Sequence, residues 1–146
     1  MNEQYKVSDG GKKILNTVKD ELFPILNQLK DLLVSIQKCR INFSIYSKEL
    51  SDLELKYSDL ATSFFTVTKK LKTPDILFSG LDDNPQNIAD YFQFQDAFSL
   101  SIEEGTKYVE IIDRTLDRKS QNIQNFRTII LAFTAIVISI ISIIWK

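Results

Sequence analysis

The chain of 146 residues contains no histidine, one cysteine, three prolines and four glycines. The absence of histidine removes the most common acid–base catalyst and metal ligand, and a single cysteine excludes a disulfide within the chain. The shortage of glycine and proline argues for long, uninterrupted elements. Neither a glycine-rich phosphate loop nor a serine or cysteine paired with histidine occurs. These absences predict a protein that is not an enzyme and that needs no cofactor or metal ion.

Basic and acidic residues nearly balance, with a net charge of −1, so overall charge predicts no general attraction to nucleic acid. The first residues, MNEQYKVSDGGKK, contain no apolar stretch of signal-peptide length. Cys39 alone is compatible with a reducing compartment, and we expect it to pack in a core. The sequence therefore predicts that the last segment is the only one that inserts into a membrane.

That last segment is the long hydrophobic run TIILAFTAIVISIISIIW, residues 128–145. Eighteen residues of helix extend about 27 Å, which is enough to cross the hydrocarbon core of a bilayer. Arg127 and Lys146 flank the run, and Trp145 occupies the position of an interfacial aromatic anchor. Basic residues are more frequent before the run than after it, so the positive-inside rule places residues 1–127 in the cytoplasm and the C-terminus at the far side. This is the layout of a tail-anchored, single-pass membrane protein.

Small and hydroxylated residues recur through this predicted span at helical spacing. Steps of 4, 3, 4 and 3 place five of them on one stripe: Thr128, Ala132, Ala135, Ser139 and Ser142. Helices in membranes pack closely through such residues, so we expect the spans to self-associate, with this stripe packing between copies or lining a pore. The alternative is that the hydroxyl residues are passengers in a lipid-facing anchor. Thr134 lies off the stripe and favours neither interpretation.

A second apolar stripe runs through the first half of the chain. Alternate steps of 3 and 4 from Leu15 to Leu71 meet only apolar or aromatic residues, which is typical of long helices in coiled-coil-like packing. Pro24 predicts a kink or a helix start near Asp20, and the stretch RINFSIYS, residues 40–47, has weak helix propensity. We expect a helix over about residues 12–72, either whole in an antiparallel hairpin or broken into two helices of a three-helix bundle.

Another long helix is predicted from about residue 87, and its apolar stripe keeps its register through Phe126 into the span. Neither proline nor glycine separates this helix from the span, so we expect one rigid helix that transmits movement between the soluble part and the membrane. Gly105 is its soft point, either a close-packing site or a bend. The predicted fold is all-α, with a helical bundle over residues 1–127 continuous with a transmembrane helix.

Two segments of the bundle are candidates for contact with partners. The loop at residues 73–86 contains two prolines and a glycine. Its apolar residues either fold back as a lid or form a tip that binds a protein partner: Ile76, Leu77, Phe78 and Leu81. The basic run KKLK ends the first predicted helix, where cations suit the helix dipole. The alternative is a patch for an anionic ligand, such as a nucleotide or oligonucleotide, formed by Lys69, Lys70 and Lys72.

Two resemblances bear on function. The segments YSDLATSFFTVTKKL and YVEIIDRTLDRKSQNIQNF resemble helices of sorting-nexin-type BAR domains, in an aromatic-plus-small-residue helix end and an aromatic–acidic–arginine pattern. This resemblance implies a membrane tether or a curvature-shaping adaptor without pore activity. The chain departs from it where the BAR fold adds a third helix and this chain enters the bilayer.

The whole layout, a compact helical module on a rigid span with a small-residue stripe, is similar to the small pore-forming membrane effectors of bacterial anti-phage defence systems. That resemblance implies a pore or channel assembled from the spans of several subunits and gated by a cytoplasmic domain that senses a signal. The pore-forming effector is the first expectation from the sequence, and the tether or adaptor is the alternative.

Overall fold

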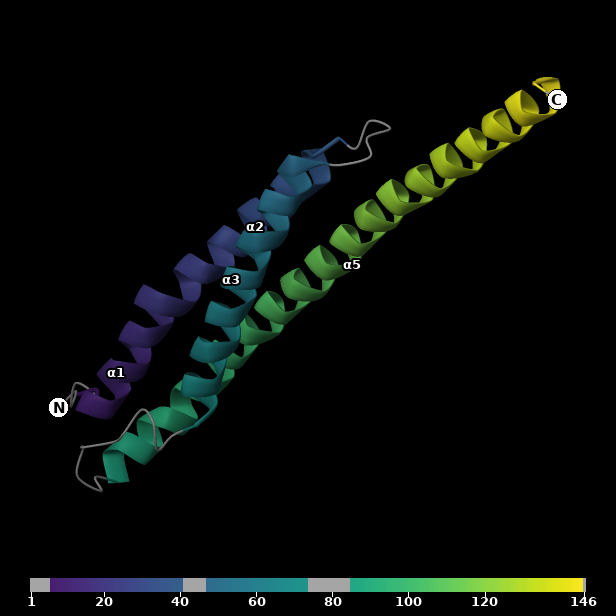
Figure 1. Ribbon diagram of the computed structural model, residues 1–146. Helices are drawn as coiled ribbons and strands as arrows, with labels where there is room; N and C mark the ends of the chain where they lie inside the picture. Colours follow the sequence, from purple (N-terminus) through teal and green to yellow (C-terminus); the bar gives the residue numbers. More distant parts are fainter. Residues whose placement is uncertain (1–5, 41–46, 74–84, 146) are drawn as a thin grey trace.

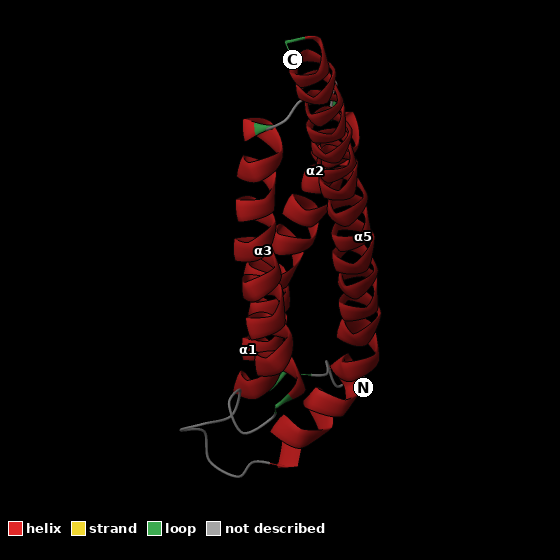
Figure 2. Ribbon diagram, turned by 45° about the vertical axis from the view of Figure 1, so that its right-hand side comes forward, coloured by secondary structure: helices red, strands yellow, loops and turns green. Residues whose placement is uncertain are grey.

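The computed structural model describes residues 6–40, 47–73 and 85–145. Helices, and no strands, make up the described segments (Figure 2). In chain order they are α1 (Asp9–Thr17), the π-helical turn η1 (Val18–Leu22), α2 (Phe23–Lys38), α3 (Lys48–Lys72) and α5 (Pro85–Ile144). The first three follow one line, α3 returns beside them, and α5 runs along the bundle and projects beyond it (Figure 1). The all-α prediction is confirmed, and of its two arrangements the chain adopts the three-helix bundle.

The helix expected over about residues 12–72 is two helices. α2 ends at Lys38, and α3 begins at Lys48. The hydroxyl of Ser47 caps α3 by accepting a hydrogen bond from the backbone N–H of Leu50 at 3.2 Å. The chain therefore reverses direction between them, which places the end of α2 at the end of the bundle from which α5 projects (Figure 1).

Pro24 accounts for an irregular turn in the first arm. Proline lacks an N–H, and in a regular α-helix its ring clashes with the carbonyl four residues earlier. In η1 the N–H of Phe23 instead donates to the carbonyl of Val18, five residues back, and this wider turn relieves the clash. Leu22, which precedes α2, makes no side-chain cap. The proline thus lies in the first turn of α2, directly after the wider turn η1.

The core lies where the line of α1, η1 and α2 faces α3 and α5. Its side chains without solvent exposure are Ile14, Leu22, Leu29, Ile36, Phe64, Leu71 and Ile112. The stripe predicted on α5 supplies buried residues from Tyr91 to Ile123. Among the described residues of the bundle, two members of the predicted stripes are exposed and not buried: Leu15 is 42% exposed, and Ile88, the first residue of the stripe on α5, is 54% exposed. At the first of these sites, Ile14 occupies the core position one residue earlier.

Gly105 is a close-packing site, not a bend. A methyl group built on its Cα would overlap the ring of Phe64 and lie 2.6 Å from Cδ2 of Leu26. Carbon atoms in van der Waals contact are about 3.5–4.0 Å apart. The missing side chain therefore lets α5 approach both α2 and α3, while α5 itself stays helical through this residue.

A buried polar cluster joins the start of α1 to the start of α5. The backbone N–H of Ser8 donates to Oδ2 of Asp90 at 2.7 Å, and the Ser8 hydroxyl donates to the same oxygen. The N–H of Gly10 donates to Oδ1 of Asn87 at 3.1 Å. Asp90 has no solvent exposure, and a buried carboxylate requires such donors because burial without them is costly. These bonds fasten the end of the bundle that lies farthest from the projecting part of α5.

Candidate functional site

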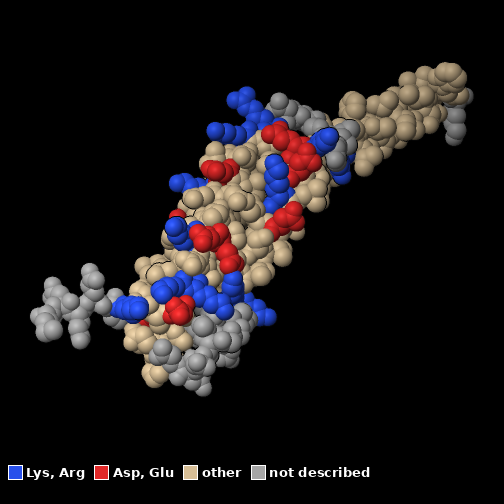
Figure 3. Space-filling view, turned by 90° about the vertical axis from the view of Figure 1, so that its left-hand side faces the viewer, with Lys and Arg blue, Asp and Glu red and all other residues tan. Residues whose placement is uncertain are grey.

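The projecting part of α5 is the candidate membrane span. An 18-residue window of this helix has a mean hydropathy of 2.4 and is 0% buried. Within the described ranges it is the one helix long and apolar enough to cross a membrane. Its side chains face outward, with Leu131 70% and Ile143 75% exposed, and it extends from the bundle without a charged atom (Figure 3). Soluble monomers rarely expose so large a contiguous apolar surface, which favours a lipid or protein environment for this segment.

The small-residue stripe is exposed along one side of this segment. Its members are Thr128, Ala132, Ala135, Ser139 and Ser142. The hydroxyls of Thr128 and Ser139 donate to the backbone carbonyls four residues earlier, at 3.0 and 2.8 Å. Thr134, off the stripe, does the same at 2.9 Å. These hydroxyl hydrogens are satisfied within the helix, so they add little cost in lipid, and each oxygen retains a lone pair that accepts a further hydrogen bond.

The junction between bundle and span is uninterrupted α-helix. Ile123, at 8% exposed, is the last buried residue that α5 contributes to the core. Arg127 is exposed four residues later, and Trp145, at the other end of the apolar segment, is 87% exposed. Lys146 lies outside the described residues. Arg127 and Trp145 therefore bracket the apolar segment, and their role as interface anchors stays a prediction.

The lysines of KKLK do not converge on one site. Nζ of Lys70 lies 2.5 Å from Oε1 of Glu21 and joins α3 to η1. Lys72 lines a cleft of about 420 Å³ together with two glutamates of α5, and Lys69 is exposed. Glu21 offsets the charge of Lys70, whereas the two glutamates beside Lys72 form ion pairs with Lys107 and Arg114. This arrangement favours a role in completing the end of α3 over a site for an anionic ligand.

The other predicted contact site, the apolar loop residues Ile76, Leu77, Phe78 and Leu81, lies outside the described residues. Cys39 is 2% exposed and belongs to the core. Its burial raises the pKa of the thiol, so the thiol stays protonated at neutral pH, as a packing residue would. In the described segments no three His, Cys, Asp or Glu side chains form a group that would hold a metal ion.

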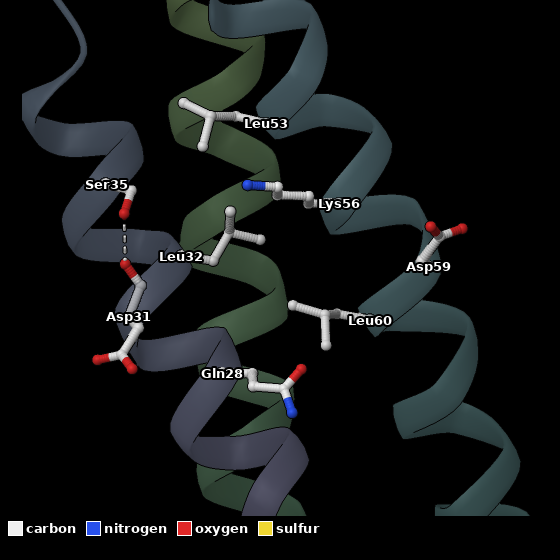
Figure 4. A pocket seen from close by; sticks show the side chains of 8 residues that line it. All are labelled: Gln28, Asp31, Leu32, Ser35, Leu53, Lys56, Asp59 and Leu60. Atoms are coloured by element: carbon white, nitrogen blue, oxygen red, sulfur yellow. Dashed lines mark hydrogen bonds between the residues drawn. The ribbon is translucent and has the colours of Figure 1, made fainter.

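A shallow groove of about 470 Å³ lies between α2 and α3. Leucine side chains from both helices point into the space between them, and polar side chains stand around it (Figure 4). Asp31 and Asp59 point away from each other, and the hydroxyl of Ser35 donates to the backbone carbonyl of Asp31 at 2.9 Å. Ligand sites have polar groups that converge on one position. The polar groups here do not, so the groove is better explained as the packing seam of two helices.

A scan against protein-family models, a search of the curated proteins and a search of the solved structures each found no match for this chain. Function is therefore inferred from the residues and geometry of the chain alone.

Proposed function

We propose that this protein is a single-pass membrane protein whose spans self-associate into a membrane-permeabilising assembly, controlled by the three-helix bundle. The observation that carries the proposal is the unbroken helix α5, which belongs to the bundle core at one end and is apolar on all sides at the other. A helix of 60 residues is about 90 Å long. This length is enough for one uninterrupted helix to run along a small domain and then cross a bilayer.

Membrane insertion is supported by length, composition and exposure together. The apolar segment is long enough for the hydrocarbon core, and its backbone N–H and C=O groups are paired within the helix, as lipid requires. Arg127 at one end and Trp145 at the other suit the two interfaces. The excess of basic residues on the bundle side, which includes Arg118 and Lys119, orients the bundle toward the cytoplasm.

Self-association is supported by the stripe from Thr128 to Ser142. Helices in lipid gain no hydrophobic energy by meeting, so they associate where small residues allow close contact. The stripe supplies such residues on one face, and its hydroxyl oxygens keep acceptor capacity for a neighbouring helix or for water. Several copies arranged with this face inward would enclose a narrow path less apolar than lipid.

Control by the bundle is supported by the continuity of the junction. A change in bundle packing rotates or tilts the span, because no residue between Ile123 and Arg127 interrupts the helix. A membrane tether, the other candidate function, requires neither this rigidity nor the stripe, since a flexible connection serves a tether equally well.

The test is release of a self-quenched dye from liposomes that contain the purified full chain. We expect release from the wild type, and less release from the double variant Ala135→Ile with Ser139→Ile, because added bulk keeps the spans apart. The matched control, Ile140→Leu with Ile144→Leu, alters the opposite face and should behave as the wild type. Crosslinking in detergent should show the loss of higher oligomers for the first pair only. Absence of dye release from bilayer-inserted wild type would contradict the permeabilising function and favour the tether.

A further inference from the structure

The charges of this chain are distributed unevenly along the rod. Residues 32–49 and 118–145 carry six basic side chains and one acidic side chain, a net charge of +5. The rest of the chain carries twelve basic and eighteen acidic side chains, a net charge of −6. The two positive segments are separated by about 70 residues of sequence, so the linear sequence does not reveal that they form one region.

The fold brings these segments to the same end of the bundle. α2 ends and α3 begins beside the part of α5 that leads into the span (Figure 1). Nζ of Lys119 in α5 donates to the backbone carbonyl of Cys39, which follows α2, at 2.6 Å. The result is a basic collar around the root of the span, composed of Lys38, Arg40, Lys48, Arg118, Lys119 and Arg127.

The collar faces solvent. Lys119 is half-buried, and the other five side chains are exposed. Basic side chains are visible at the end of the bundle from which the uncharged span projects (Figure 3). Glu49 is the one carboxylate within the two segments, and the exposed Asp117 directly precedes Arg118. Six basic and two acidic side chains leave the collar with a net charge of +4.

The position of the collar selects its partner. Thr128 follows Lys119 by nine positions, which is about 14 Å along the helix. The polar layer of a bilayer occupies about 5–8 Å of that distance. The collar therefore lies within about one Debye length of the headgroups, roughly 8 Å at physiological ionic strength, and lysine and arginine side chains extend toward them. A cluster of four to eight basic residues beside a span is the usual basis for attraction to anionic lipids.

We propose that the basic collar docks the end of the bundle onto anionic lipid headgroups, so that the assembly senses the charge of the leaflet in which its bundle lies. This inference rests on the proposed membrane insertion of α5. It adds Lys38, Arg40 and Lys48, residues distant from the span in sequence, to the membrane-contacting surface. Because α2 and α3 reach the headgroups through these residues, the lipid acts on the bundle as well as on the span.

The experiment measures lipid selectivity of the full chain in phosphatidylcholine bilayers, by electron paramagnetic resonance of spin-labelled phosphatidylserine and spin-labelled phosphatidylcholine. We expect the wild type to associate with phosphatidylserine several-fold more strongly. In Lys38→Gln with Arg40→Gln and Lys48→Gln that preference should fall by about half or more, because half of the collar's positive charge is lost. In 1 M salt the wild-type preference should also fall, since the Debye length drops to about 3 Å.

Two controls make the result specific. Lys19→Gln with Lys30→Gln and Lys69→Gln removes the same charge from exposed positions elsewhere on the bundle, and it should keep the wild-type preference. Lys38→Arg with Lys48→Arg keeps the charge and should keep the preference, which separates charge from any loss of folding. Equal loss of preference in the two glutamine variants, or none in either, would overturn the proposal.

Flotation of the same liposomes after washing at alkaline pH separates the two levels of inference. Protein that does not float with the lipid contradicts the proposed membrane insertion. Protein that floats but shows equal affinity for both spin-labelled lipids contradicts the collar alone.

Discussion

Residues 85–126 of α5 pack against the other helices of the bundle, whereas from Arg127 to Trp145 every residue except the half-buried Ile130 is exposed. The two regions have the same backbone geometry and the same register. They differ in how apolar residues are placed around the helix axis. The packed region has a single apolar stripe and a charged opposite face, while the projecting region is apolar on all faces. The first pattern suits a boundary between core and water, and the second suits lipid.

One helix passes from the packed region to the exposed apolar region without a structural signal at the boundary. Ile123 closes the core, and Thr128 begins the apolar segment only five residues later. No cap, proline or glycine intervenes, so the hydrogen-bonded ladder carries both regions as one body. We therefore expect a force on the packed region to reach the projecting region directly.

The largest contrast is expected from the same substitution made in both regions. Ile112 has no solvent exposure and Ile140 is 51% exposed. Ile112→Ala leaves a cavity in the core and should lower the free energy of unfolding of the bundle by about 2–5 kcal/mol. Ile140→Ala should change it by less than about 0.5 kcal/mol. Urea unfolding of the full chain in mild detergent, followed by circular dichroism, measures both. Similar effects at the two sites would contradict the division of α5 into packed and projecting regions.

A smaller effect is expected where the packed region makes its closest approach to its neighbours. Gly105→Ala raises helix propensity by about 1 kcal/mol, but the new methyl group overlaps Phe64 and Leu26. Overpacking of this kind costs about 1–3 kcal/mol, so we expect net destabilisation or, at best, no gain. The exposed Ser99 provides the control, since Ser99→Ala adds propensity without a clash. The same urea titration distinguishes them, and a stabilised Gly105→Ala would show that α5 is not tightly held there.

The smallest effect is expected near the boundary itself. Nζ of Lys119 donates a hydrogen bond of 2.6 Å to the backbone carbonyl of Cys39. This bond lies close to the point where α5 leaves the bundle. Lys119→Met keeps the aliphatic part of the side chain and removes the hydrogen bond. Loss of a charged donor lowers the free energy of unfolding by about 1–3 kcal/mol, and because Lys119 is partly exposed we expect a value of about 1 kcal/mol. Alkylation of Cys39 should then become faster, because the end of α2 opens more often. Unchanged alkylation would mean that this bond does not secure the reversal.

The course of α5 was predictable from sequence, because its apolar stripe from Tyr91 to Ile123 keeps a single register and no breaker interrupts it. The reversal after Lys38 was not decided by the same reasoning. The apolar spacing continues across it, from Ile36 and Cys39 to Leu50 and Leu53, as though the helix were whole. The spacing of apolar residues shows which face of a helix is apolar, but it does not show where the chain changes direction. Only the weak helix propensity of RINFSIYS indicated the break.

The site was predictable to a similar degree. The candidate span and its small-residue stripe follow from composition and spacing alone, and the roles of the stripe and of the flanking anchors stay predictions. The basic collar did not, because Lys38, Arg40 and Lys48 approach the span only after the chain reverses. The role of Asp90 was equally hidden, since both of its hydrogen bonds from Ser8 come from a position about 80 residues earlier. Contacts between segments distant in sequence depend on the packing of whole helices, which single-sequence patterns do not encode.

The central claim, that the bundle and the span form one rigid rod, is tested most directly by a distance. Spin labels at Glu110→Cys and Ile138→Cys, in a Cys39→Ala background, lie 28 residues apart, about 42 Å in a continuous helix. Double electron–electron resonance on the full chain in nanodiscs, diluted with unlabelled protein, should give one narrow distribution near that value. Inserting Gly-Gly-Gly after Asn125 adds a flexible joint and should broaden the distribution. A distribution without the insertion that is already broad, or centred at a much shorter distance, would contradict the rigid rod.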